Sequence, residues 1–370
     1  MARRLAQLAV LLLCIAALAL SQQRKPTLEK VPVDEDTVIR GGISLVDLLV
    51  SVRDKKGAVA ANLQQTDFRI LEDGRQQEIR RFTRETDLPL TIGMVVDVSG
   101  SVADEIPDEQ VAARLFFNQV LRPQDQAFLI RFASEAELLQ DTTSSLSKLQ
   151  SGLDELGAGM RPVRPRFFVD PSAQFFQFPF PSPFPGGGGG GSRRGPYPGG
   201  GGGGTPPISG GQGGRGGQNK GTVLNDAVFL ASDEVLKPLT GRKAIILITD
   251  GEDHGSLVSL SEAVEATLKA DTIVYSIFVK RDVFGPNSED VLQRLSGDTG
   301  GRVFTLQRRN LDKIFKEIEE ELRAQYSIAY VSSNPAEDGG FRRIDVQMMD
   351  KSYTARTRKG YFAATAGANR

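Results

Sequence analysis

The chain has 370 residues, which is long enough for two or three domains. Its 45 lysines and arginines nearly balance 46 acidic residues, so no basic excess indicates a nucleic-acid partner. Hydrophobic residues make up 39% of the sequence and Cys14 is its single cysteine, so the fold must depend on a buried apolar core and not on disulfides.

The N-terminus has the pattern of an export signal. Arg3 and Arg4 precede an apolar run at residues 8–20, and small residues follow. This predicts a Sec-type signal peptide over residues 1–21. The run is short for a membrane span, which needs about 20 residues, although an uncleaved anchor is the alternative. After cleavage we expect no transmembrane span and no cysteine, which fits a bacterial protein of the periplasm, the cell surface or the secreted fraction.

A polar linker at residues 22–36 leads into an N-terminal β segment at residues 37–87. Residues 43–52 predict a strand, and a turn signal follows it. Two further alternating stretches, joined by a Glu-Asp-Gly turn, predict strands at residues 68–71 and 77–82. About 50 residues is small for an independent domain.

Strand and helix patterns alternate over residues 88–323, which predicts an α/β domain with a mostly parallel sheet. The expected strands are residues 90–96, 126–132, 243–249, 272–279 and 302–306. The expected helices are residues 108–120, 144–156, 225–236, 261–269, 290–296 and 311–323. A C-terminal β segment, residues 324–370, returns to strand patterns. The predicted fold class is therefore a doubly wound α/β sheet flanked by helices, with a small β module built from the N- and C-terminal flanking strands.

A low-complexity insert rich in Pro, Phe and Gly interrupts the α/β domain at residues 161–217. This composition does not form a packed core. It is either a tolerated tether or an aromatic arm that contacts a partner or the cell wall.

The pattern Asp97-x-Ser99-x-Ser101 stands at the end of a buried strand. Open α/β sheets bind their ligands at this edge. A carboxylate and two hydroxyls are hard oxygen donors, which suit Mg²⁺, Mn²⁺ or Ca²⁺. Taken alone the motif also fits an ordinary turn in which Asp97 caps a helix.

Two later positions complete the donor set. Thr222 stands where the insert ends and a helix begins, so its hydroxyl either caps that helix or faces a ligand. Asp250 ends the second fully apolar strand. Two carboxylates and three hydroxyls would leave room for water in an octahedral Mg²⁺ site.

These five residues resemble the metal ion-dependent adhesion site (MIDAS) of von Willebrand factor type A (VWFA) domains. Asp97, Ser99 and Ser101 match its Asp-x-Ser-x-Ser element, Thr222 its separate threonine and Asp250 its second aspartate. The flanking segments resemble exported VWFA-related proteins of Acidobacteria. The resemblance implies a VWFA/Rossmann-like fold, a bound divalent cation, and a protein partner whose Glu or Asp carboxylate completes the coordination.

Three polar residues after Asp250 have alternative interpretations. Glu252 and Asp253 are either solvated turn acids or groups that tune the site from outside. His254, the single histidine, is either a ligand or an exposed loop residue, and we favour the exposed residue.

The sequence favours a cation-dependent protein-binding module for adhesion or assembly. An enzyme is not expected, because we find no histidine cluster, no cysteine in the mature chain and no nucleophile motif. The alternative is an envelope scaffold whose metal is only structural and whose aromatic, glycine-rich insert mediates assembly.

Overall fold

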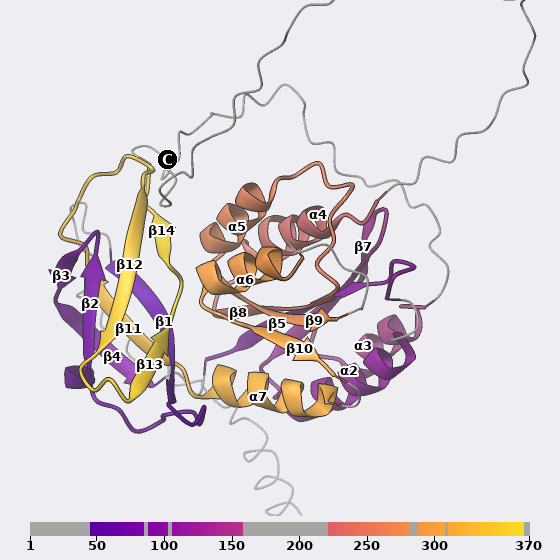
Figure 1. Ribbon diagram of the computed structural model, residues 1–370, viewed down its shortest axis with the longest axis horizontal. Helices are drawn as coiled ribbons and strands as arrows, with labels where there is room; N and C mark the ends of the chain where they lie inside the picture. Colours follow the sequence, from indigo (N-terminus) through magenta and orange to yellow (C-terminus); the bar gives the residue numbers. More distant parts are fainter. Residues whose placement is uncertain are drawn as a thin grey trace, which may run out of the picture.

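The computed structural model describes residues 45–84, 88–102, 106–157, 221–280, 288–307 and 310–365. The predicted signal peptide, linker and insert lie outside the described residues. The described chain forms two bodies, a β-sandwich and an α/β domain (Figure 1).

The α/β domain is built on a six-stranded sheet with the order β10-β9-β8-β5-β6-β7. All pairs are parallel except β6 with β7. Every residue of the three central strands β5, β8 and β9 is buried, as expected for a sheet covered on both faces. The strands are β5 (Leu90–Asp97), β6 (Gln126–Phe132), β7 (Ala136–Thr143), β8 (Arg242–Thr249), β9 (Thr272–Val279) and β10 (Val303–Leu306).

Helices cover both faces of this sheet (Figure 1). Side chains alternate along a strand, so Ile246 of β8 packs in one core and its neighbours Ile245 and Leu247 pack in the other. The first core includes α2 (Ile106–Val120), α3 (Leu146–Asp154) and α7 (Leu311–Arg323). The second includes α4 (Leu224–Phe229) with its π-helical continuation η3 (Leu230–Leu236), α5 (Leu260–Lys269) and α6 (Ser288–Thr299). The doubly wound α/β prediction is confirmed. No helix within the described ranges is long and apolar enough to cross a membrane.

The β-sandwich consists of two four-stranded sheets, β13-β1-β11-β4 and β14-β12-β2-β3. Strand β1 pairs antiparallel with β11, so the two ends of the chain meet in one sheet. Leu48, Ile70, Ile328 and Ile344 share one buried core between the sheets. The predicted module of N- and C-terminal flanking strands is therefore confirmed. Its elements are β1 (Leu45–Asp54), η2 (Gln65–Asp67), β2 (Phe68–Glu72), β3 (Arg75–Gln77), β4 (Ile79–Arg84), β11 (Tyr326–Val331), β12 (Phe341–Met348), β13 (Tyr353–Arg356) and β14 (Gly360–Phe362).

Two strand predictions differ from the structure. The single strand expected at residues 77–82 is divided at Glu78, because β3 pairs with β2 in one sheet while β4 pairs with β11 in the other. Strand β7 was not predicted. It is a partly exposed edge strand that shows neither strict alternation nor a continuous apolar run.

A buried carboxylate joins the two bodies. Glu321 of α7 is 0% exposed and accepts charged hydrogen bonds from Arg53 of β1 and Arg302, at 2.8 and 3.1 Å. The hydroxyls of Ser51 and Tyr275 donate to its other oxygen, at 3.3 and 3.2 Å. Both oxygens of Glu321 are thus satisfied, and α7 is fastened to the β-sandwich.

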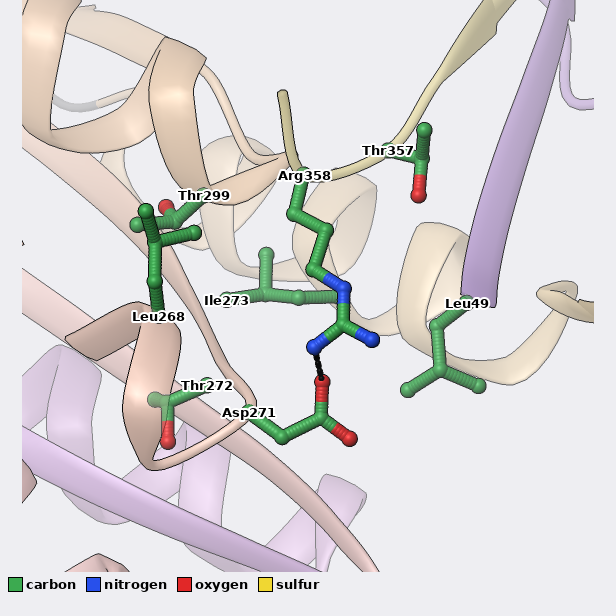
Figure 2. Close-up of a pocket in the computed structure, with 8 residues that line it drawn as sticks. All are labelled: Leu49, Leu268, Asp271, Thr272, Ile273, Thr299, Thr357 and Arg358. Atoms are coloured by element: carbon green, nitrogen blue, oxygen red, sulfur yellow. Dashed lines mark hydrogen bonds and ion pairs between the residues drawn. The ribbon is translucent and has the colours of Figure 1, made fainter. Parts of the chain in front are cut away.

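A second ion pair crosses the same junction. Arg358 extends between Leu49 and Ile273 to reach Asp271, and its Nη1 lies 2.6 Å from the Asp271 carboxylate (Figure 2). The basic residues around Arg358 are typical of a solvated strand face, but the arginine side chain is only 15% exposed. The cavity beside it measures about 10 Å³, no more than one water molecule requires.

Candidate metal centre

The candidate site lies where the strand order reverses. After β5 the chain continues to β6 on one side of it, and β8, on the other side, is followed by β9. The carboxyl ends of β5 and β8 therefore form the topological switch point, where open α/β sheets bind ligands. Asp97 is the last residue of β5, and Asp250 directly follows β8. Both are buried, at 1% and 0% exposure.

Two serines connect the two carboxylates. The Ser99 amide donates to Asp97 Oδ1 at 2.9 Å. Ser99 Oγ lies 2.9 Å from Ser101 Oγ, which donates to Asp250 Oδ2 at 2.5 Å. Four of the five predicted ligands thus form one continuous cluster of oxygens. The serines are half-buried and Gly100 between them is exposed, so the hydroxyls form the rim of a site whose carboxylates lie beneath.

The backbone of Thr222 is hydrogen-bonded to the loop that follows β8. Its carbonyl accepts hydrogen bonds from the amides of His254 and Gly255, at 3.0 and 3.1 Å, in the loop that follows Asp250. Val223, not Thr222, is the N-cap of α4, so the capping alternative is wrong. Among the described residues, no hydrogen bond joins the Thr222 hydroxyl to the other four predicted ligands.

The two carboxylates carry their charges in a buried site. Burial raises the pKa of Asp97 to about 6, and the nearby Asp250 adds to the rise, while hydrogen bonds from Ser99 and Thr249 oppose it. In the described part of the chain, neither Asp97 nor Asp250 forms an ion pair with a basic side chain. Two buried carboxylates without a counter-charge are costly, and a bound cation would offset that cost.

The donor chemistry fits a hard dication. Carboxylate and hydroxyl oxygens are the ligands that Mg²⁺, Mn²⁺ and Ca²⁺ accept. Nowhere in the described ranges do three or more His, Cys, Asp or Glu side chains gather as a metal-binding group. Asp97, Ser99, Ser101 and Asp250 would hold the ion.

Thr249 is a supporting residue that the sequence analysis missed. It is fully buried and donates from Oγ1 to Asp97 Oδ2 at 2.7 Å. Thr249 Oγ1 also accepts a hydrogen bond from the Gly251 amide at 3.1 Å, which fixes the turn after Asp250. The available signal was a hydroxyl residue between an apolar strand and an aspartate.

The polar residues after Asp250 take structural or exposed positions. The half-buried Asp253 carboxylate accepts hydrogen bonds from the amides of Asn225 and Ser256, at 3.2 and 3.1 Å. It therefore stabilises the loop and is not a solvated acid. The His254 side chain is 66% exposed, as expected for an exposed loop residue, and its Nε2 lies 3.3 Å from Oε2 of Glu252.

No protein-family model matches the chain, and no curated protein matches its sequence. Solved structures of similar fold include the conserved hypothetical protein BatB from Bacteroides thetaiotaomicron, at 17% identity and a TM-score of 0.40, covering 63% of this chain and 99% of that one. Proximal thread matrix protein 1 from the mussel byssus, with a zinc-occupied MIDAS motif, matches at 16% identity and a TM-score of 0.43, covering 68% of this chain and 50% of the other. A von Willebrand factor type A structure from Catenulispora acidiphila matches at 11% identity and a TM-score of 0.41, covering 89% and 76%. The fold class rests on the sheet topology of this chain itself.

Proposed function

We propose that this chain is an exported, divalent-cation-dependent protein-binding module for adhesion or assembly, in which a carboxylate of a partner completes the coordination of the ion. The observation that carries the proposal is the pair of buried carboxylates, Asp97 and Asp250, which are bridged by Ser99 and Ser101 and lack a basic partner among the described residues. Mg²⁺ is the ion we expect, with Mn²⁺ or Ca²⁺ as substitutes.

The arrangement of the site supports binding from outside. The carboxylates lie beneath and the half-exposed hydroxyls lie at the rim, so a further ligand would approach past Ser99, Gly100 and Ser101. Few direct carboxylates leave a bound cation electrophilic, and it then attracts an acidic group. The protein holds the donors in place through Thr249 and the amide of Ser99.

Binding, and not catalysis, is the activity we propose. Close to Asp97 and Asp250 the described groups are hydroxyls and amides, which position and donate but do not serve as a general base. His254 is exposed and pairs with Glu252.

Calorimetric titration of Mg²⁺ and of Mn²⁺ into the full chain tests the metal site. We expect one ion per chain for the wild type and no binding heat for Asp97→Ala. Glu252→Gln is the matched control, since it removes a nearby charge that no predicted ligand contacts, and it should bind like the wild type. Equal heats from the wild type and from a cooperatively melting Asp97→Ala would contradict the proposal.

Capture of partners from an envelope extract separates binding from scaffolding. If the metal mediates binding, EDTA and Asp97→Ala abolish capture, while deletion of residues 161–217 leaves it. Capture that requires residues 161–217 and survives EDTA would instead favour the scaffold with a structural metal.

A further inference from the structure

The loop between β8 and α5 carries a highly exposed apolar side chain. Leu257 is 89% exposed, more than any other large hydrophobic residue in the described ranges. The loop begins directly after Asp250, so it lies at the same edge of the sheet as the candidate site. Its inner neighbours Val258 and Leu260 pack against the core of the α/β domain.

This loop is held rigidly by the residues that follow Thr222. The Asp226 carboxylate of α4 accepts the amides of Leu257 and Val258, at 2.9 and 2.8 Å. The amide of Asp226 donates in return to Ser256 Oγ at 3.1 Å. The backbone around Leu257 is therefore ordered before any partner arrives.

The same loop touches the segment that carries Thr222. A Cβ added at Gly221 would lie 2.3 Å from His254 Cβ, so only glycine allows the two backbones to approach this closely. Together with the bonds from His254 and Gly255 to the Thr222 carbonyl, this contact fixes Leu257 relative to a predicted ligand.

A single exposed leucine is ordinary on a protein surface. Leu257 differs because its backbone donates charged hydrogen bonds to Asp226 and its loop is hydrogen-bonded to the backbone of one predicted ligand, Thr222. A contact that is ordered in advance costs less entropy when a partner covers it. Because the side chain packs against so little of this chain, the fold does not require it.

We propose that Leu257 contacts the partner that binds at the candidate metal site. The partner is then a protein segment that carries a carboxylate and, at a fixed spacing from it, a large exposed apolar side chain. This inference rests on the proposed function and adds the chemistry of the partner. The carboxylate would supply affinity for the cation, and the apolar residue would select among acidic segments.

A displayed peptide library tests this directly. Peptides with a central Asp or Glu and randomised flanks are bound to the full chain in Mg²⁺ and eluted with EDTA. The wild type should enrich Leu, Ile, Met or Phe at one fixed spacing from the acid. For an enriched peptide made synthetically, Leu257→Asn should weaken binding about tenfold, in proportion to the loss of a buried leucine.

Two controls make the result specific. Met349→Asn changes a 65% exposed apolar residue of the β-sandwich and should leave the affinity unchanged. Replacing the apolar residue of the peptide by Asn should weaken binding to the wild type about tenfold and should cause no further loss with Leu257→Asn, because both changes remove one contact.

The outcomes distinguish the role of Leu257 from the proposed metal-dependent binding. Peptides that depend on Mg²⁺ and Asp97 but bind Leu257→Asn normally would overturn the role of Leu257 and leave the metal function standing. Peptides that bind equally in EDTA or to Asp97→Ala would overturn the proposed function. A library that yields no EDTA-eluted peptide would count against both.

Discussion

Two buried acidic sites in this protein differ in the groups that surround their negative charges. At the junction with the β-sandwich, Glu321 is paired with Arg53 and Arg302 and accepts two further hydroxyl hydrogen bonds. At the carboxyl edge of the sheet, Asp97 and Asp250 have hydroxyl and amide neighbours but, among the described residues, no basic one. The first site is complete within the chain, whereas the second, as we propose, would gain its missing charge from a cation. Removing an acid should therefore have opposite effects at the two sites.

The largest effect is expected at Glu321. Glu321→Gln would leave the partly buried Arg53 without a counter-charge and Arg302 with Glu317 alone, and should lower the free energy of unfolding by about 3 kcal/mol. Urea denaturation measures the change. Glu320→Gln, at an exposed position of the same helix, is the control and should change the free energy of unfolding by less than about 0.5 kcal/mol. An equally small effect of Glu321→Gln would remove the contrast between the two sites.

Addition of Mg²⁺ should stabilise the wild type by the next largest amount. At a free concentration one hundred times Kd, the gain in free energy of unfolding is about 2.7 kcal/mol. Ser101→Ala removes a predicted ligand and should lose most of this gain at the same concentration. Ser256→Ala, in the loop braced by Asp226, should keep it. Thermal melts in EDTA and in Mg²⁺ make the measurement, and equal shifts for both serine variants would speak against the assigned ligands.

Asp97→Asn should stabilise the protein when no metal is present. It removes a charge that burial and Asp250 disfavour, so in EDTA at neutral pH we expect the free energy of unfolding to rise by about 1 to 2 kcal/mol. Asp253→Asn in the neighbouring loop should have the opposite sign, because that carboxylate accepts several backbone amides. Destabilisation by Asp97→Asn would show that the site is already balanced within the protein.

The smallest effect is expected at the half-exposed ion pair of Arg358 with Asp271, shown in Figure 2. The Asp271 side chain is 53% exposed, so solvent screens its charge. Its backbone has a φ of 52°, a conformation that asparagine also tolerates. Asp271→Asn should therefore lower the free energy of unfolding by less than about 1 kcal/mol in urea denaturation. A loss as large as that of Glu321→Gln would show that pairing, and not burial, sets the size of these effects.

The sequence predicts the central part of the fold well because the strands there are buried on both faces. The continuous apolar runs of β5, β8 and β9 are visible without any knowledge of their neighbours. Edge strands carry a weaker signal, which is why β7 was missed. The division at Glu78 depends on which partner strand each half meets, and that information lies far away in the sequence.

Local sequence pattern also identifies part of the candidate site. Residues at the ends of apolar strands, such as Asp97 and Asp250, are identified by local pattern. The supporting roles of Thr249 and Asp253 are set by the direction of individual hydrogen bonds, which a pattern of residue types does not contain. The burial of Arg358 is not visible in the sequence either, because its partner Asp271 belongs to the other body of the molecule.

The interleaved β-sandwich determines the order in which the chain can fold. Ser327 of β11 donates a hydrogen bond to Asp47 of β1, 280 residues away in the sequence. Strands β1 to β4 therefore leave the ribosome long before β11 to β14 exist to pair with them. Contacts between such distant segments form slowly, because a long loop must close first. The α/β domain brings the two ends together when it folds, so the sandwich should close last, and its early strands are the segment most exposed to mispairing during synthesis.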